Sequence, residues 1–238
     1  MNIDGLADEI DRELRARGTP VRATNEKAYL KSDLQHYGTT VPDIRSIAKA
    51  LSRRLAPIKH ADLLKVTTDL WAEPVHERRM AAVELLQQNQ ELLRPADIKL
   101  LERFLRESRT WALVDSLSAS VVGPLVERNP ALVKVLDRWA TDADFWIRRS
   151  ALLALLGGLR RGEGDFDRFS KYADAMLEEK EFFIRKAIGW VLRETAKKRP
   201  DLVYQWVLPR AARASGVTLR EAVKPLPEPQ RSAILANR

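Results

Sequence analysis

Apolar residues recur every three or four positions through almost the entire chain, and the segments do not alternate apolar with polar residues as half-buried strands would. Prolines divide the pattern into stretches of roughly 10 to 16 residues, which is a usual helix length. Gly157 and Gly158, followed by Gly162 and Gly164, predict the end of the helix that begins near Trp146. The pattern therefore predicts an all-α protein.

The later helices are predicted to be of two alternating kinds. Trp146 follows Trp111 by 35 residues, and Phe183 follows Trp146 by 37, so equivalent helices recur at nearly even spacing. This period indicates HEAT-like repeats, in which antiparallel helix pairs stack into a curved solenoid with inner helices on its concave face. The expected outer helices span 130–140, 167–178 and 200–210, and the expected inner helices span 111–125, 145–156 and 182–197. We expect a single domain over 1–238, with an N-terminal helical segment at 1–28 and an irregular C-terminal end at 223–238.

The inner helix at 182–197 has two distinct faces when its residues are placed 100° apart. Its core stripe is predicted to contain Ile184, Ala187, Ile188, Val191 and Thr195, and its basic face Lys186, Trp190, Arg193 and Lys197. An indole between cations suits contact with the bases and phosphates of a nucleic acid. The alternative is a half-buried Trp190 that packs at the edge of the core.

The inner helix at 111–125 pairs an indole with a carboxylate. Leu113, Val114, Leu117, Val121 and Leu125 form its expected core stripe. Trp111 and Asp115 then lie one turn apart on a neighbouring face. Asp115 either stabilises the N-terminal end of the helix dipole or stabilises positive charge that develops on a sugar.

The inner helix at 145–156 has two cations in its first turn, Arg148 and Arg149. Together with the helix N-terminus they predict a phosphate site. The alternative is an ion pair between repeats, with a carboxylate such as Asp144.

Composition narrows the possible chemistry. The 238 residues include no cysteine, and the three histidines, His36, His60 and His76, show no ligand spacing, so we expect neither a metal nor a cofactor. A net charge of +8 favours a polyanionic partner. No signal peptide or membrane-spanning stretch is evident, so we expect the protein in the cytoplasm, associated with the nucleoid and not with a membrane. We also expect a monomer.

One long stretch, residues 181–194 with the sequence EFFIRKAIGWVLRE, resembles the AlkD-like DNA alkylation repair glycosylases, which are built of HEAT-like repeats. Supporting matches are Trp111 to Ser116, Trp146 to Ala151, Gly123, Asn129-Pro130, Leu70-Trp71 to Pro74, Tyr29 to Lys31 with Gly38, Pro42 to Arg45, Ala196-Lys197 and Pro200-Asp201. The resemblance covers most of the chain from about Tyr29 to about Ala222.

The resemblance implies hydrolysis of the N-glycosidic bond of N3- or N7-alkylated purines in double-stranded DNA, without enclosure of the damaged base and without a cofactor. Asp115 matches the acidic residue that supports the cationic sugar and the attacking water. Trp111 and Trp190 match the indoles around the lesion, Arg149 the phosphate-binding arginine, and Tyr29 a nearby aromatic. Arg148, Lys186, Arg193 and Lys197 complete the expected DNA-binding set.

Two positions depart from the family pattern. Thr110 stands where another aromatic is expected, and Val41 stands where a hydroxyl residue usually precedes the proline, so a helix cap is expected to be lost. Two other functions remain open: a non-catalytic HEAT-repeat protein that binds distorted or branched DNA by shape, and a protein-binding scaffold. The pairing of Asp115 with Trp111 and Trp190 favours the glycosylase, because pure binding does not need the carboxylate.

Overall fold

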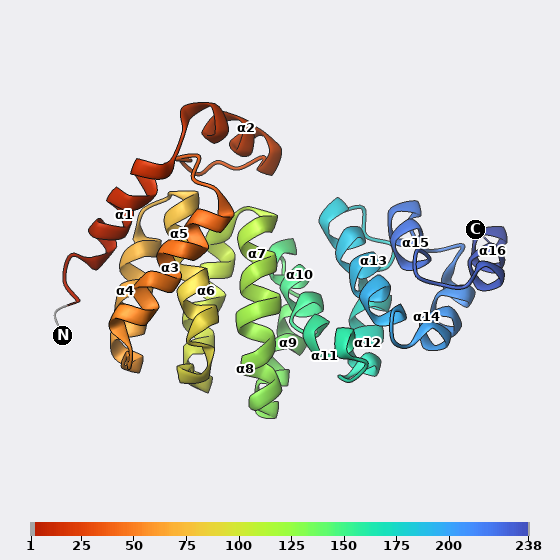
Figure 1. Cartoon of the computed structure of the whole chain (residues 1–238). Helices are drawn as coiled ribbons and strands as arrows, with labels where there is room; N and C mark the ends of the chain where they lie inside the picture. Colours follow the sequence, from red (N-terminus) through yellow and green to blue (C-terminus); the bar gives the residue numbers. More distant parts are fainter. Residues whose placement is uncertain (1–2, 238) are drawn as a thin grey trace. The chain divides into compact units, whose positions relative to one another are not determined.

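The computed structural model describes residues 3–237, and this part of the chain is helical and contains no β-strand (Figure 1). Gln35 and Val75 form an isolated parallel bridge. No helix within residues 3–237 is long and apolar enough to cross a bilayer. The chain forms two compact units, unit 1 up to Leu117 and unit 2 from Ser118.

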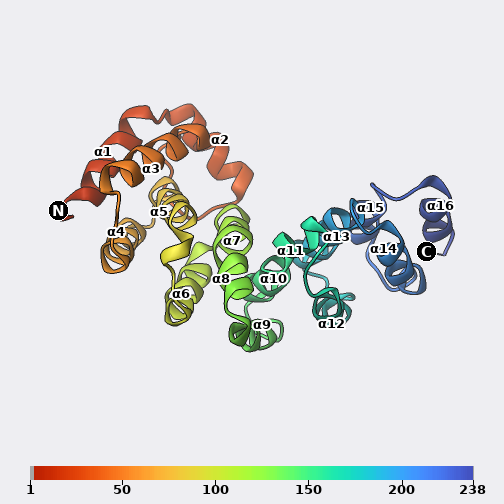
Figure 2. The ribbon, with the colours of Figure 1, turned by 60° about the horizontal axis from the view of Figure 1, so that its bottom comes forward.

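Unit 1 consists of helices in two layers with an additional helix, α2, at its edge. Figure 2 shows α3, α5 and α7 in one layer and α4 and α6 in the other. Helix α5 is buried continuously from His76 to Leu86, whereas Leu30 is the buried residue of α2. The helices are α1 (Leu6–Arg17), α2 (Pro20–Leu30), α3 (Val41–Leu55), α4 (His60–Ala72), α5 (His76–Gln88), α6 (Ile98–Ser108) and α7 (Trp111–Leu117), with 3-10 turns at Gln90–Leu92 and Pro95–Asp97.

The expected loss of a helix cap at Val41 does not occur. Thr40, one residue earlier, caps α3 by accepting a hydrogen bond from the backbone N–H of Asp43 at 3.2 Å. Val41 is the first residue of the helix, and Pro42 occupies a first-turn position that needs no N–H donor. The capping hydroxyl is therefore that of Thr40, one position before the expected site, and it still accepts a hydrogen bond from a backbone N–H at the start of the helix.

Unit 2 also has two layers. Figure 2 shows α10, α13 and α15 in one layer and α9, α12 and α14 in the other. The elements are a π-helical turn (Ser118–Val122), α8 (Gly123–Arg128), α9 (Val133–Trp139), α10 (Phe145–Leu153), α11 (Leu156–Arg161), α12 (Phe166–Met176), α13 (Phe182–Ala196), α14 (Pro200–Val207), α15 (Gly216–Ala222) and α16 (Glu228–Ala236), with 3-10 turns at Pro130–Leu132 and Leu208–Arg210.

The structure confirms the core stripes that the helical period predicts. Each residue assigned to the stripes at 111–125 and 182–197 is buried, from Leu113 and Val114 in α7 to Ile188 and Thr195 in α13. The helical period predicts the buried face correctly because an amphipathic helix gains most of its stability from burying one apolar face.

Two predicted helix boundaries are wrong. Gly157 and Gly158 do not end a helix, because α11 runs through both and ends before Gly162, whose φ of 87° favours glycine. Gly158 is needed for close packing, since a Cβ there would lie 3.1 Å from the Cα of Gly164. The expected irregular end at 223–238 contains helix α16, which buries Ile234.

Two helical glycines, Gly189 in α13 and Gly157 in α11, should respond oppositely to replacement by alanine. A Cβ at Gly189 would lie 2.8 Å from the Cβ of Glu221 and 2.9 Å from the carbonyl oxygen of Thr218, so Gly189→Ala should lower the free energy of unfolding by about 1–3 kcal/mol. A Cβ at Gly157 would meet only the ends of two flexible side chains, Glu127 at 3.4 Å and Arg161 at 3.5 Å. Gly157→Ala should therefore raise the free energy of unfolding by about 0.5–1 kcal/mol.

Urea denaturation of both variants and the parent measures these changes. An unchanged unfolding free energy for Gly189→Ala would contradict the close approach of α13 and α15.

Candidate nucleic-acid interface

The predicted pair of an indole and a carboxylate lies on the partly exposed side of α7. Trp111 is the first residue of the helix, and Asp115 follows one turn later, while Leu113, Val114 and Leu117 face the core. Trp111 and Asp115 are both intermediate in exposure. The structure therefore places the two side chains on one accessible face, as the period predicts.

Tyr29 lies against this face from the neighbouring helix α2. Its ring is 72% exposed, and its centroid is 5.7 Å from that of Trp111, with the ring planes at 82°. Edge-to-face contact of this kind is favourable for aromatic rings and leaves their outer surfaces available. Unit 1 thus brings together three of the predicted site residues: Tyr29, Trp111 and Asp115.

Thr110 occupies the last position before α7 and is almost fully buried, at 1% exposed. Its carbonyl oxygen accepts a hydrogen bond from the backbone N–H of Val114 at 3.2 Å, which helps to start the helix. Because Thr110 is buried, its departure from the family pattern concerns packing inside unit 1 and not the partly exposed face of α7.

Arg148 in the first turn of α10 is committed to protein contacts. Its guanidinium makes two hydrogen bonds to the carboxylate of Glu179, at 2.7 and 3.0 Å, and another to the carbonyl oxygen of Asp142 at 2.6 Å. The ion pair left open for this turn therefore exists, with Glu179 as the partner. Asp144 instead caps α10 by accepting a hydrogen bond from the backbone N–H of Trp146 at 2.9 Å.

Arg149 joins α10 to the N-terminal end of α13. It is 4% exposed, and its guanidinium donates to the carbonyl oxygen of Phe183 and lies 5.9 Å from the centroid of the Phe183 ring. The sequence assigns Arg149 to phosphate binding, and the structure shows that its guanidinium also connects two helices.

An aromatic cluster lies at the same end of unit 2. Trp146 stands 4.4 Å from Phe145 and 4.8 Å from Phe183, measured between ring centroids. Phe182, which packs edge-to-face on Phe183 at 5.5 Å, is 50% exposed. The sequence analysis uses these residues as markers of the repeat and of the family resemblance and assigns them no binding role, although exposed aromatics beside cations are the usual surface for stacking on nucleic acid.

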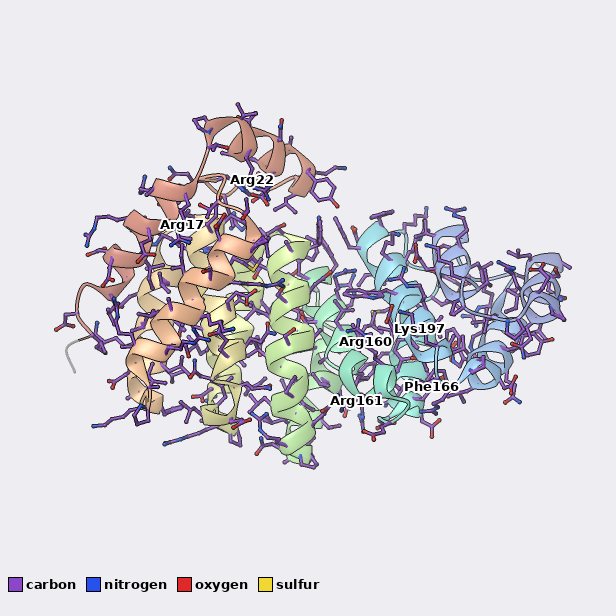
Figure 3. The ribbon with its side chains drawn as sticks, in the orientation of Figure 1. Arg17, Arg22, Arg160, Arg161, Phe166 and Lys197 are labelled. Atoms are coloured by element: carbon purple, nitrogen blue, oxygen red, sulfur yellow. The ribbon has the colours of Figure 1, made fainter. Side chains whose placement is uncertain are left out.

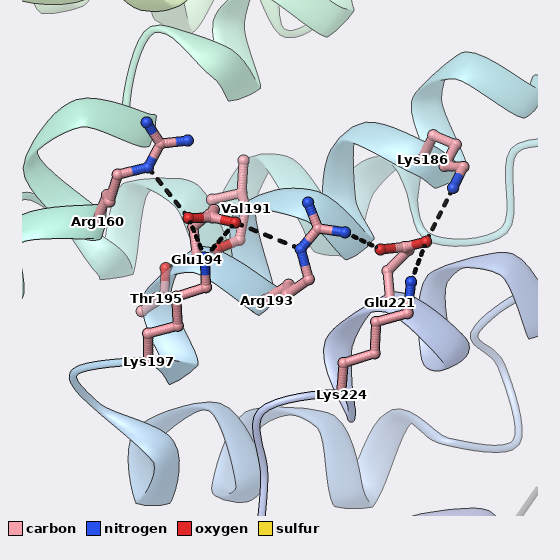
Figure 4. Close-up of polar contacts among 9 residues, drawn as sticks. All are labelled: Arg160, Lys186, Val191, Arg193, Glu194, Thr195, Lys197, Glu221 and Lys224. Atoms are coloured by element: carbon pink, nitrogen blue, oxygen red, sulfur yellow. Dashed lines mark hydrogen bonds and ion pairs between the residues drawn. The ribbon is translucent and has the colours of Figure 1, made fainter.

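The basic face of α13 exists as predicted, but two acidic residues lie within it. Lys186, Trp190 and Arg193 are intermediate in exposure, and Lys197 is exposed. Glu194 on α13 and Glu221 on α15 have side chains that are each only 8% exposed. Figure 4 shows the resulting network, in which Arg160, Arg193 and Lys197 contact Glu194, and Lys186, Arg193 and Lys224 contact Glu221.

The network leaves excess positive charge on this face. The N–O distances are 2.9 Å for Lys186–Glu221, 2.8 Å for Lys197–Glu194 and 3.2 Å for Arg160–Glu194. Five cations surround two carboxylates, so the formal sum is 5 − 2 = +3. Arg160 and Lys197, labelled in Figure 3, bring α11 and α13 into the same basic surface.

The cations determine the ionisation of the two acids. Burial acts to raise the pKa of Glu221, but hydrogen bonds from Lys186 and Lys224 and the nearby positive charge outweigh it and lower the pKa to about 2. Burial also acts to raise the pKa of Glu194, which a hydrogen bond from Lys197 and the charge of Arg160 lower overall. Both carboxylates are therefore ionised at neutral pH and hold their cations in place.

No pattern in the sequence predicts this network. Glu221 and Lys224 lie outside the helices considered for chemistry, and Glu194 lies between the predicted core stripe and the basic face. Their contacts depend on the packing of α15 against α13, which a helical period on a single segment does not reveal.

Comparison with known proteins identifies the family. A family model described as a DNA alkylation repair enzyme matches residues 10–226, which is most of the chain. The chain belongs to the DNA alkylation repair enzyme family. Membership supports a role in the repair of alkylated DNA, with DNA as the partner, and confirms the resemblance seen in the sequence.

Two solved structures of similar proteins have the same fold as this chain. A predicted DNA alkylation repair enzyme from Enterococcus faecalis is 23% identical, covers 89% of this chain and 98% of its own, and superimposes with a TM-score of 0.79. AlkD2 from Streptococcus mutans is 14% identical over 94% of this chain and 99% of its own, with a TM-score of 0.58. No curated protein matches the chain significantly. The two structures confirm the all-α fold.

The lowered pKa of Glu221 predicts how stability depends on pH. Because the folded pKa of about 2 lies below the ordinary value of 4.5, ionised Glu221 stabilises the folded state fully above pH 4.5, and this stabilisation is lost as the pH falls towards 2. The difference in unfolding free energy between the parent and Glu221→Gln should therefore be largest at neutral pH and shrink below pH 4.5.

Urea denaturation at successive pH values checks this dependence, with Glu91→Gln as the control for loss of an exposed carboxylate. A difference that grows as the pH falls would show that the network does not stabilise ionised Glu221.

Proposed function

We propose that the protein is a DNA glycosylase that hydrolyses the N-glycosidic bond of N3- or N7-alkylated purines in double-stranded DNA, without enclosing the damaged base. The observation that carries the proposal is the position of Asp115 one turn from Trp111 on an accessible face of α7, with Tyr29 against the indole. Family membership supports DNA as the substrate.

The chemistry needs few groups. An alkylated purine is cationic and leaves without protonation by a strong acid, so the enzyme mainly has to stabilise an oxocarbenium-like sugar and orient a water molecule. Asp115 supplies the negative charge for both tasks. The indole of Trp111 presents its electron-rich face to the cationic sugar. By the family resemblance, Trp190 would contact the deoxyribose backbone of the DNA.

The basic surface of unit 2 would hold the phosphate backbone. Lys186, Arg193 and Lys197 have side chains that are 42%, 30% and 53% exposed, and the carboxylates beneath them fix their positions. Cations that are ordered before binding lose less conformational entropy when they meet phosphates. Arg148 contributes positive charge while it remains bound to Glu179. Arg149 is almost fully buried, so the phosphate contact that the resemblance implies for it stays a prediction.

The first prediction concerns the substrate. Purified protein should release 7-methylguanine and 3-methyladenine from methylated DNA, and EDTA should not abolish the release, because no step of this chemistry uses a metal. Uracil should be released poorly, since its neutral leaving group needs protonation that Asp115 does not supply. Absence of base release with enzyme in excess over methylated DNA would reject the glycosylase and favour a non-catalytic DNA-binding protein.

The second prediction concerns binding. With roughly four to six phosphate contacts, log K against log salt should have a slope of about −4 to −5. Lys197→Gln should reduce the slope by about 1 and weaken binding equally for different sequences. Lys171→Gln, which removes an exposed lysine from the other layer of unit 2, is the matched control and should bind as the parent does.

Fluorescence anisotropy at several salt concentrations gives the slopes. Equal slopes for the parent and Lys197→Gln would place the DNA on another surface.

A further inference from the structure

Three side chains that can bind a metal meet in unit 1, apart from the residues assigned to DNA. They are Glu26 on α2, His36 in the loop that follows α2, and Glu77 in the first turn of α5. One ligand atom from each lies within 4.8 Å of those from the other two. The three segments therefore present one nitrogen and two carboxylate oxygens to a common point.

Each carboxylate has one oxygen bound firmly by the protein and another with unused capacity. The guanidinium of Arg22, labelled in Figure 3, donates to Oε1 of Glu26 at 3.2 Å, whereas Oε2 of Glu26 is buried without a hydrogen-bond partner among residues 3–237. Oε1 of Glu77 accepts from the backbone N–H of Gly38 at 2.6 Å. Oε2 of Glu77 accepts a hydrogen bond from the backbone N–H of Tyr37 at 3.0 Å and retains a lone pair for another partner.

His36 is the clearest sign of a missing partner. Both of its ring nitrogens are shielded from solvent, and neither has a hydrogen-bond partner within the described part of the chain. The ring stacks on His76, with centroids 4.7 Å apart and planes at 11°, and His76 itself is only 2% exposed. Buried polar atoms normally have partners because leaving one unsatisfied costs about 1–3 kcal/mol. A cation beside the two carboxylates would supply one.

His36 borders a cavity at the surface of unit 1, and helix α2 buries little apolar surface. His36, Lys27 and Asp33 line a surface cavity of about 490 Å³. Because α2 buries only Leu30 among its residues, apolar packing attaches it weakly to the rest of unit 1. An ion coordinated by both Glu26 and Glu77 would link α2 directly to α5.

We propose that Glu26, His36 and Glu77 bind one divalent transition-metal ion, best matched by zinc, and that this ion fastens α2 to α5. Zinc accepts imidazole nitrogen and carboxylate oxygen together, and three protein ligands leave a fourth position for water. Magnesium prefers an all-oxygen shell, so imidazole excludes it. The ion takes no chemical step in base release; it holds α2, which carries Tyr29 to Trp111.

The sequence could not reveal this cluster. The spacing of the three histidines shows no ligand pattern, and only one of them belongs to the cluster. Its other members are glutamates from two helices that meet only in the fold.

Zinc titration of the chelator-treated full-length protein tests the proposal without any need for DNA or glycosylase activity. Calorimetry should show one zinc ion per chain. Thermal unfolding should shift to higher temperature with zinc and stay unchanged with an equal concentration of magnesium. Zinc should also slow hydrogen exchange of the backbone amides of α2.

Two variants remove a ligand in different ways. His36→Phe keeps a ring to stack on His76 but has no nitrogen, and Glu26→Gln keeps an oxygen for Arg22 but removes the charge. Each should weaken zinc binding at least about 100-fold, more than loss of an outer-shell partner does. His60→Gln is the control, because His60 lies on α4 and pairs with Asp97 at 2.8 Å.

The outcomes are distinct. Zinc binding by the parent and His60→Gln, but not by His36→Phe or Glu26→Gln, supports the site. Equal binding by all four proteins places the ion elsewhere and overturns it, as does the absence of saturable binding by the parent. Zinc binding at these residues with unchanged hydrogen exchange in α2 would overturn the fastening of the helix.

Discussion

The pairing of two buried carboxylates with surface cations determines where unit 2 presents positive charge. Glu194 and Glu221 are almost fully buried, and an ionised carboxylate is unfavourable there unless cations compensate it. The cations that compensate come from α11, from α13 and its C-terminal end, and from the turn after α15, so the charge network and the packing of these helices depend on each other. Removing either acid would disturb both the core beneath α13 and the surface above it.

This arrangement links stability to the proposed DNA contacts. Lysine and arginine side chains lose considerable rotamer entropy when they are ordered. Here the folded protein has already ordered several of them around Glu194 and Glu221, while a net positive charge remains for phosphates. In unit 1 the same principle holds for rings, because Tyr29 and Trp111 are oriented by each other before any substrate is present.

The sequence predicted those features that depend on one helix at a time. The core stripe through Ile184 and Ile188 and the shared face of Trp111 and Asp115 follow from the helical period, and both are present. Contacts between helices, such as that of Lys186 on α13 with Glu221 on α15, could not be predicted from the helical period. The helix end predicted from glycine at Gly158 is wrong, because this residue lies inside α11, where it packs closely against Gly164.

The decisive measurement is single-turnover release of 7-methylguanine by Asp115→Asn, with affinity for the same DNA measured in parallel. Asp167→Asn is the matched control, because Asp167 is an exposed carboxylate in the first turn of α12. Asp115→Asn should excise the base about 100-fold more slowly and bind DNA as tightly as the parent or more tightly, whereas Asp167→Asn should behave as the parent. Excision at the parental rate by Asp115→Asn would show that Asp115 is only a helix-end carboxylate.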